Sequence, residues 1–115
     1  MAKVDKMNKE KIKYKAKGVV LGNLWGGGKG FYTARTLEAE NLSNLKAQII
    51  KGIKTGSLDS GMGYESLIGA VMEITKITEV IIEGKPFINK EAELKSFSIP
   101  TEFEEEAENF LYASF

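Results

Sequence analysis

The sequence predicts an α+β fold: one mainly antiparallel sheet, with elements in the order β-β-α-β-β-β, and two amphipathic helices, the second at the C-terminus. Several segments alternate apolar and polar residues, as half-buried strands do, and two others repeat apolar residues every three or four positions, as helices do. Strands and helices do not alternate regularly, which favours an antiparallel sheet. The 115 residues predict a single domain over residues 10–115, preceded by a mobile basic arm over residues 1–9.

The first two predicted strands form a hairpin around a glycine-rich loop. Between residues 11 and 17, lysines alternate with Ile12, Tyr14 and Ala16, and residues 19–21 continue the strand. Residues 31–38 alternate again and are rich in β-branched and aromatic side chains, so they are predicted to pair antiparallel with the first strand.

The best helix signal covers residues 41–56. Asn41 or Ser43 can cap its start, and Gly56 ends it. Its apolar stripe consists of Leu42, Leu45, Ile49, Ile50 and Ile53. Gly52 lies inside this helix, where glycine costs about 1 kcal/mol relative to alanine, so another backbone is expected to approach closely there.

Further strands are predicted at residues 68–75 and 78–83, followed by a turn and a short strand at residues 87–89. Pro86 cannot donate to a strand ladder, so this last strand is expected to start there or to lie on a sheet edge. Residues 94–99 can add one more strand.

The final helix is predicted from Thr101, because Glu104 follows three residues later in the capping-box pattern. Its apolar stripe consists of Phe103, Ala107, Phe110 and Leu111. Its other face carries glutamates.

Composition excludes several kinds of chemistry. The chain has no cysteine and no histidine, which removes thiolate and imidazole metal sites, disulfides and histidine acid–base catalysis. No cofactor and no metal site are predicted. Because the chain has no cysteine and no stretch with the pattern of a signal peptide, a cytoplasmic location is expected. The longest apolar stretch, residues 67–82, is interrupted by charged residues and predicts no membrane span.

The glycine-rich loop around Trp25 matches no phosphate-binding motif. A Walker A loop requires glycine where Asn23 stands, a hydroxyl residue where Gly30 stands, and a helix where a strand is predicted. The dinucleotide fingerprint would require glycine at Phe31. An anion nest remains open, as does a flexible hairpin tip. Turn chemistry does not explain Trp25, which is expected to cover its own hairpin, a ligand or a partner.

A second glycine-rich stretch, residues 55–66, raises the same question. It is either a plain connection or the second wall of a pocket, if both loops meet at one rim of the sheet. The predicted pocket residues are Trp25, Gly26, Gly27, Gly28, Lys29, Tyr32, Arg35, Asp59 and Tyr64. The function expected from such a pocket is non-catalytic binding of a phosphate-bearing small ligand or of another protein.

Two other function classes stay open. Lys11, Lys13, Lys15 and Lys17 recur along one strand face at close to the phosphate spacing of a single nucleic-acid strand, which suggests a nucleic-acid-binding accessory protein. The zero net charge argues against it. A small enzyme would use Asp59 or Glu65, but no nucleophile–base spacing supports it.

The motifs "LGNLWGGGKGFYTAR" and "GSLDSGMGYESLIGA", with a lysine-rich start and a glutamate-rich end, resemble small uncharacterised proteins of phages and mobile elements of low-GC bacteria. The resemblance implies a binding role, such as an anti-defence or accessory factor, in the host cytoplasm. The apolar C-terminal segment with Phe110, Leu111, Tyr112 and Phe115 also predicts a homodimer.

Overall fold

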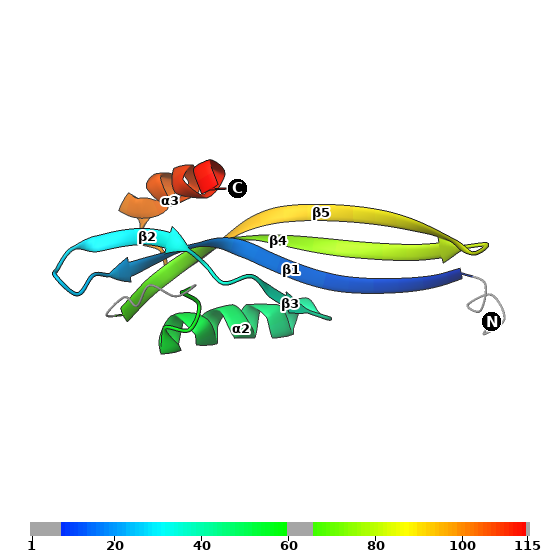
Figure 1. The fold of residues 1–115 in the computed structure, drawn as a ribbon, viewed down its shortest axis with the longest axis horizontal. Coiled ribbons are helices and arrows are strands. Elements are labelled where there is room, and N and C mark those ends of the chain that lie inside the picture. The colour runs from blue at the N-terminus through cyan, green and yellow to red at the C-terminus, as the bar shows by residue number, and fades with distance from the viewer. Residues whose placement is uncertain (1–7, 60–65, 115) are drawn as a thin grey trace.

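The computed structural model describes residues 8–59 and 66–114, and it confirms the α+β class. Within these residues, one antiparallel sheet of five strands carries two helices, the second at the C-terminus (Figure 1). The elements are β1 (Asn8–Asn23), β2 (Lys29–Thr33), β3 (Leu37–Ala39), α2 (Leu42–Thr55), β4 (Ser66–Ile82), β5 (Lys85–Phe97) and α3 (Thr101–Ser114). Most of the predicted basic arm, residues 1–7, lies outside the described part.

The sheet has the strand order β2-β1-β4-β5, and the short strand β3 also pairs with β1. Neighbouring strands are antiparallel throughout. β1 and β4 are paired from one end to the other, from Asn8 opposite Ile82 to Asn23 opposite Ser66. These two long central strands determine the elongated shape of the molecule, whose principal extents are 61 × 25 × 23 Å.

The strand predicted over residues 31–38 is wrong in its length, because the chain leaves β1 between β2 and β3. The Ala34 N–H donates to the Gly18 carbonyl at 2.8 Å, and the next N–H, that of Arg35, donates to Leu58 at 2.7 Å. The chain turns at this point toward the end of α2. Two tight backbone bonds to different partners therefore divide one sequence pattern into two strands.

The short strands predicted in the second half join into two long ones. β4 contains residues 68–75 and 78–82 of the predicted strands, and Glu83 belongs to the turn; β5 contains residues 87–89 and the part of the predicted strand 94–99 up to Phe97. The turn between them places Glu83 and Gly84 at positive φ, and Pro86 lies on the outer strand of the sheet as predicted. The strands continue through the polar residues at which the sequence pattern predicted breaks, because β4 and β5 are paired with each other along their length.

The two helices cover opposite faces of one half of the sheet (Figure 1). The core under α2 contains Ala16, Val20, Ala34, Leu45, Ile49, Leu58, Ala70, Met72 and Ile74. The core under α3 contains Val19, Leu21, Val71, Ile99, Ala107 and Leu111, with Phe31, Phe103 and Phe110 packed against it. The rings of Phe103 and Phe110 lie 6.3 and 5.9 Å from that of Phe31. Both predicted helix stripes therefore face the sheet, except for Ile50, which was predicted in the α2 stripe but is 45% exposed.

The close approach predicted at Gly52 is confirmed. A Cβ placed there would lie 2.9 Å from Cβ of Leu58, and the Leu58 N–H donates to the Gly52 carbonyl at 3.1 Å. A glycine inside α2 thus lets the following segment fold back and bury Leu58, which is 1% exposed.

Asn41 caps α2, and its replacement by alanine is expected to destabilise the protein by about 1 kcal/mol. The Asn41 side chain accepts a hydrogen bond from the Asn44 N–H at 2.8 Å, which satisfies a donor that the helix leaves unpaired. Urea denaturation followed by circular dichroism measures the loss. Asn44→Ala is the matched control, because it removes an exposed amide but keeps the bonded N–H; an equal loss in both variants would contradict the capping role.

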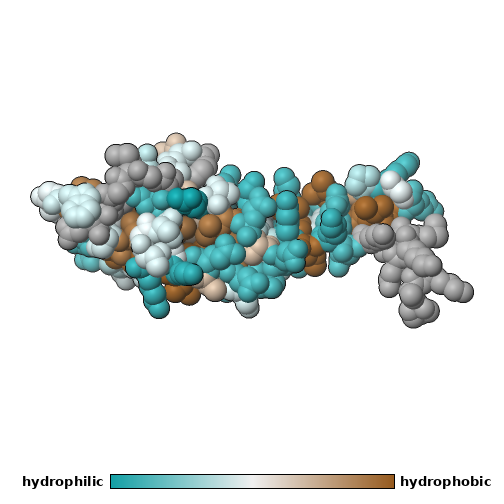
Figure 2. Space-filling view, turned by 60° about the horizontal axis from the view of Figure 1, so that its bottom comes forward, coloured by the Kyte–Doolittle hydropathy of each residue, from teal (hydrophilic) through white to brown (hydrophobic). Residues whose placement is uncertain are grey.

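The other half of the sheet has no helix on either face (Figure 1). We call it the sheet extension; it comprises residues 10–15 of β1, 75–82 of β4 and 85–92 of β5. Large apolar side chains are exposed on it, namely Ile12, Ile82, Phe87 and Ile88 at 37, 44, 55 and 61%. Figure 2 shows hydrophobic surface between hydrophilic side chains along this part of the molecule. Among the described residues, neither helix has the length and apolarity needed to cross a bilayer.

Candidate functional site

The glycine-rich loop forms an ordered tip at one end of the molecule. β1 and β2 pair up to Asn23 opposite Lys29, and the five residues between them close the hairpin. The Leu24 N–H donates to the Gly28 carbonyl and the Gly27 N–H donates to the Leu24 carbonyl, both at 3.0 Å. Gly27 and Gly28 have φ of 95° and 83°, which glycine adopts without strain. The loop is thus a defined turn that needs its glycines.

Trp25 projects from this tip and is 72% exposed, the highest value among the large exposed hydrophobic residues of the described part. Leu24 beside it is 40% exposed, and its side chain lies over Gly30. A Cβ atom added at Gly26, Gly27 or Gly28 would have no neighbouring atom within 4 Å. The tip is therefore a protruding apolar knob, with open space around its backbone.

The other predicted pocket residues from the first hairpin do not gather around Trp25. Lys29 begins β2 at the tip, but Tyr32 is half-buried and packs against the core under α2. Arg35 lies past the far end of β2, where its Nε donates to the Ser57 carbonyl at 3.2 Å. Since the adjoining residue Ala34 is bonded to Gly18, roughly 15 Å of strand separates this region from the tip.

The second glycine-rich stretch, residues 55–66, has one end near Arg35 and the other end near the hairpin tip. Asp59, buried at 6% exposure, forms a β-bridge with Ala34, so it lies beside Arg35 and away from Trp25. Ser66 accepts a hydrogen bond from the Asn23 side chain at 2.9 Å, which places the start of β4 beside the tip. Gly61, Tyr64 and Glu65 lie outside the described residues. The nine predicted residues therefore form no single pocket among the described ones.

The lysine row consists of Lys11, Lys13, Lys15 and Lys17 on β1. It lies on the same face of the sheet that α3 covers in the other half of the molecule. Lys11, Lys13 and Lys15 are exposed, and Lys17 is half-buried nearer to α3. Glutamates lie along the row: Lys13 contacts Glu38 at 3.8 Å, Lys17 contacts Glu73 at 4.0 Å, and Lys11 is directly opposite Glu79 on β4. These carboxylates reduce the positive potential that a nucleic-acid strand would require.

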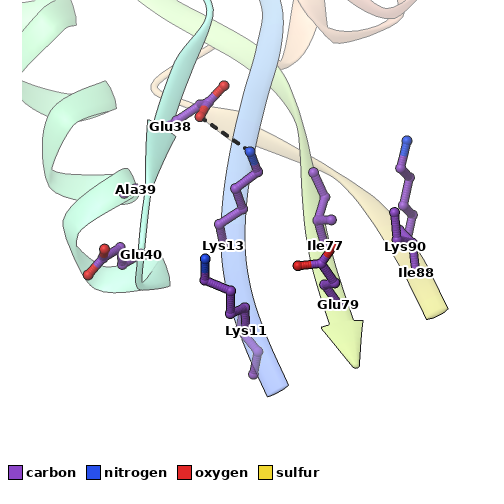
Figure 3. A pocket seen from close by; sticks show the side chains of 10 residues that line it. Lys11, Lys13, Glu38, Ala39, Glu40, Ile77, Glu79, Ile88 and Lys90 are labelled. Carbon is purple, nitrogen blue, oxygen red and sulfur yellow. Dashed lines mark ion pairs between the residues drawn. The ribbon is translucent and has the colours of Figure 1, made fainter. Parts of the chain in front are cut away.

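An open groove of about 660 Å³ lies on the sheet extension (Figure 3). Its lining residues are Lys11, Ile12, Lys13, Glu38, Ala39, Glu40, Ile77, Glu79, Ile88 and Lys90. Apart from Lys11 and Lys13, the sequence patterns did not single out these residues as a site. The sequence signal that could have indicated the groove is the alternation of apolar and polar residues through residues 74–82. It joins the two predicted strands into one and extends β4 beyond the part of the sheet that the helices cover.

No group of acidic side chains within the described residues is placed to hold a metal ion. The chain matches no protein family, no curated protein and no solved structure. Its function must therefore be inferred from its own surface.

Proposed function

We propose that this chain is a non-catalytic binding protein that docks on another protein through the hairpin tip carrying Trp25. The observation that carries this proposal is the 72% exposure of Trp25 on a turn fixed by two backbone hydrogen bonds. Tryptophan is among the residues that contribute most to protein interfaces, and a preordered loop loses little entropy on binding. Leu24 adds apolar surface beside it.

A protein partner fits this tip better than a phosphate-bearing small ligand. Capture of a phosphate by a glycine loop requires several N–H groups directed at the anion. Here the N–H groups of Leu24 and Gly27 are already donated within the loop. Arg35, the second predicted cation, lies away from the tip against the Ser57 carbonyl. A protruding knob instead complements a concave surface on a partner.

Trp25→Ala is expected to weaken partner binding at least thirtyfold, the usual effect of removing an interface hot spot of about 2 kcal/mol. Folding stability should change by no more than about 0.5 kcal/mol, because the side chain is mostly in solvent. Wild-type and variant proteins are immobilised, exposed to extract from the cells that produce the chain, and compared by quantitative mass spectrometry. Affinity is then measured with the purified retained protein.

Ile50→Ala is the matched control, because Ile50 is also an exposed apolar residue, at 45%, but lies on α2. The proposal requires a protein retained by the wild type and by this control but lost with Trp25→Ala. Identical retained proteins in all three experiments would refute it. Since Trp25 is the only tryptophan, saturable quenching of its fluorescence by a nucleotide would instead support the small-ligand alternative.

A further inference from the structure

β5 forms one edge of the sheet, and no further strand lies beside its outer side among the described residues. It pairs with β4 from Lys85 to Phe97 without a bulge, so this edge is regular. Its first part, residues 85–93, is exposed and lies beyond the half of the sheet that the helices cover (Figure 1). An edge of this kind presents unpaired N–H and C=O groups to which another strand can add.

The hairpin turn before β5 determines which backbone groups of the edge point outward. Ile82 pairs with Lys85 across a two-residue turn, and Glu83 and Gly84 both have positive φ, as in a type I′ turn. A turn of this type directs the N–H of the residue after it toward the opposite strand. The odd-numbered residues of β5 therefore bond to β4, and the even-numbered ones point outward. Pro86, which has no N–H, belongs to the outward set, as expected of proline on an edge.

The other open edge of the sheet extension is the first part of β1, and its lysines disfavour pairing with a second copy. On that side, β3 pairs with residues 14–16 and β2 with residues 19–23, which leaves residues 8–13 open. Every second residue from position 9 to position 15 is a lysine. Antiparallel pairing of this segment with its own copy places lysine opposite lysine, which is repulsive. β5 is therefore the edge available to a second copy.

Charge also restricts how one β5 can pair with another. Because outward residues must lie opposite outward residues, one residue of each copy lies at the two-fold axis. Registers with the axis at residues 90–93 place Lys90 opposite Lys90, or place Glu91 and Glu93 opposite glutamates. Like charges directly opposite each other destabilise a strand pair. An axis at Asn89 is the register with the longest paired stretch that avoids such contacts.

We propose that two copies of this chain pair through β5 in an antiparallel register with Asn89 at the two-fold axis, so that residues 85–93 of each copy extend the other's sheet. Lys85 of each copy then lies opposite Glu93 of the other, and that carboxylate also contacts Lys95 of its own strand at 3.1 Å. The two strands form about six backbone hydrogen bonds. Their donors are the outward N–H groups of Ile88, Lys90 and Ala92 in both copies.

The remaining contacts are compatible with this register. Ile88 of each copy lies opposite Lys90 of the other. The two Lys90 side chains lie diagonal to each other, and each is also diagonal to Glu79 of its own β4, which offsets the repulsion. Past Glu93, each β5 runs beyond the hairpin turn of the other copy. The helix-covered halves therefore project in opposite directions, and α3 of neither copy obstructs the pair.

The interface is small, so the dimer is expected to be weak. Two paired nine-residue stretches bury on the order of 800 Å² in total, and interfaces of this size are transient. A dissociation constant on the order of 10–100 μM is expected. The pair closes at two chains and carries a hairpin tip at each end. That the dimer can hold two partner molecules rests on the function proposed for Trp25, whereas the strand pairing does not.

This dimer does not use the apolar C-terminal segment. Phe110 and Leu111 pack on the chain's own sheet, and Phe115 lies outside the described residues. Of the apolar residues in that segment, Tyr112 is the exposed one in the described part. The backbone edge of β5 thus replaces this segment as the proposed dimer contact.

Exchanging two charges within one chain tests the register. Lys85→Glu or Glu93→Lys alone places like charges opposite each other at both ends of the interface, so the dimer dissociation constant is expected to rise about fivefold or more. The double variant restores opposite charges in its own homodimer and is expected to return to within about twofold of the wild type. Sedimentation velocity over a concentration series up to about 1 mM measures these constants, with circular dichroism to verify folding.

Proline on the edge tests the backbone hydrogen bonds. Ala92→Pro removes an outward N–H in each copy and leaves the bonds to β4 in place, so the dimer is expected to weaken about tenfold or more. Ser96→Pro is the matched control: Ser96 also belongs to the exposed outward set of β5, but it lies outside the paired stretch. Its dimer should have the wild-type dissociation constant.

Amide exchange measured by NMR locates the pairing directly. The N–H groups of Ile88, Lys90 and Ala92 should become protected as the protein concentration rises, whereas those of Phe87 and Asn89 should be protected at every concentration by β4. A wild type that is monomeric up to about 1 mM would overturn the proposal. So would a double charge variant as weak as the single ones, or a dimer unaffected by Ala92→Pro. Growth beyond two chains would also overturn it, because pairing of β1 with β5 of the next copy does not close.

Discussion

Replacing Gly18 with alanine is expected to destabilise the protein by at least about 3 kcal/mol, because the central strand pair leaves no room for a Cβ. A Cβ at this position would overlap the carbonyl oxygen of Val71 and lie 2.8 Å from Cα of Met72. Both obstacles are backbone atoms of β4, and they cannot move without separating β1 from β4. The Gly18 carbonyl also accepts the Ala34 N–H, so the strain reaches the exit of β2.

Urea denaturation of the purified variant measures this loss as a lower transition midpoint. Gly26→Ala is the matched control: the same chemical change is made on the hairpin tip, where an added Cβ meets nothing within 4 Å. That variant should stay within about 0.5 kcal/mol of the wild type. If the two alanine variants unfolded at the same urea concentration, the inferred close approach of the β4 backbone to Gly18 would be wrong.

Much of the fold could be predicted from local patterns in the sequence. Alternation around Tyr14, the cap and end of α2 at Asn41 and Gly56, and the stripe through Ala107 and Leu111 all reflect interactions within a few residues of chain. The close approach at Gly52 was predictable for a similar reason, since an unfavourable residue inside a helix requires a compensating contact.

The breaks and the length of the strands could not be predicted in this way. Residues 31–38 alternate without interruption, yet the partners that separate β2 from β3 are Gly18 and Leu58, far away in the sequence. The continuity of β4 similarly depends on its pairing with β1 and β5. Hydrogen bonds between segments that are distant in the sequence determine both the break between β2 and β3 and the length of β4. The residue pattern of a single strand carries no information about these bonds.

The candidate site was predicted in part. The sequence singled out Trp25 because turn chemistry does not account for it, and its 72% exposure on the tip agrees with that argument. The prediction that Arg35 and Asp59 lie near Trp25 assumed that the two glycine-rich loops meet at one rim of the sheet. The structure places both residues near Ala34 instead. The groove was missed because its lining comes from four strand segments and the residue after β3.

Ile49→Ala is expected to destabilise the protein by about 3 kcal/mol, whereas Ile50→Ala should cost less than about 1 kcal/mol. The two residues are neighbours with the same side chain, so the substitutions remove the same atoms from two different sides of one helix. Ile49 is fully buried against the sheet, while Ile50 is 45% exposed. The difference therefore measures how tightly α2 packs on β1 and β4.

Thermal unfolding of the two variants, measured at the same protein concentration, gives the comparison. For a domain of this size, 3 kcal/mol lowers the melting temperature by more than about 10 °C. Similar melting temperatures for the two variants would mean that α2 is loosely attached. The cavity left at position 49 would then cost nothing, and α2 could not hold Leu58 and the neighbouring bridge between Asp59 and Ala34 in place.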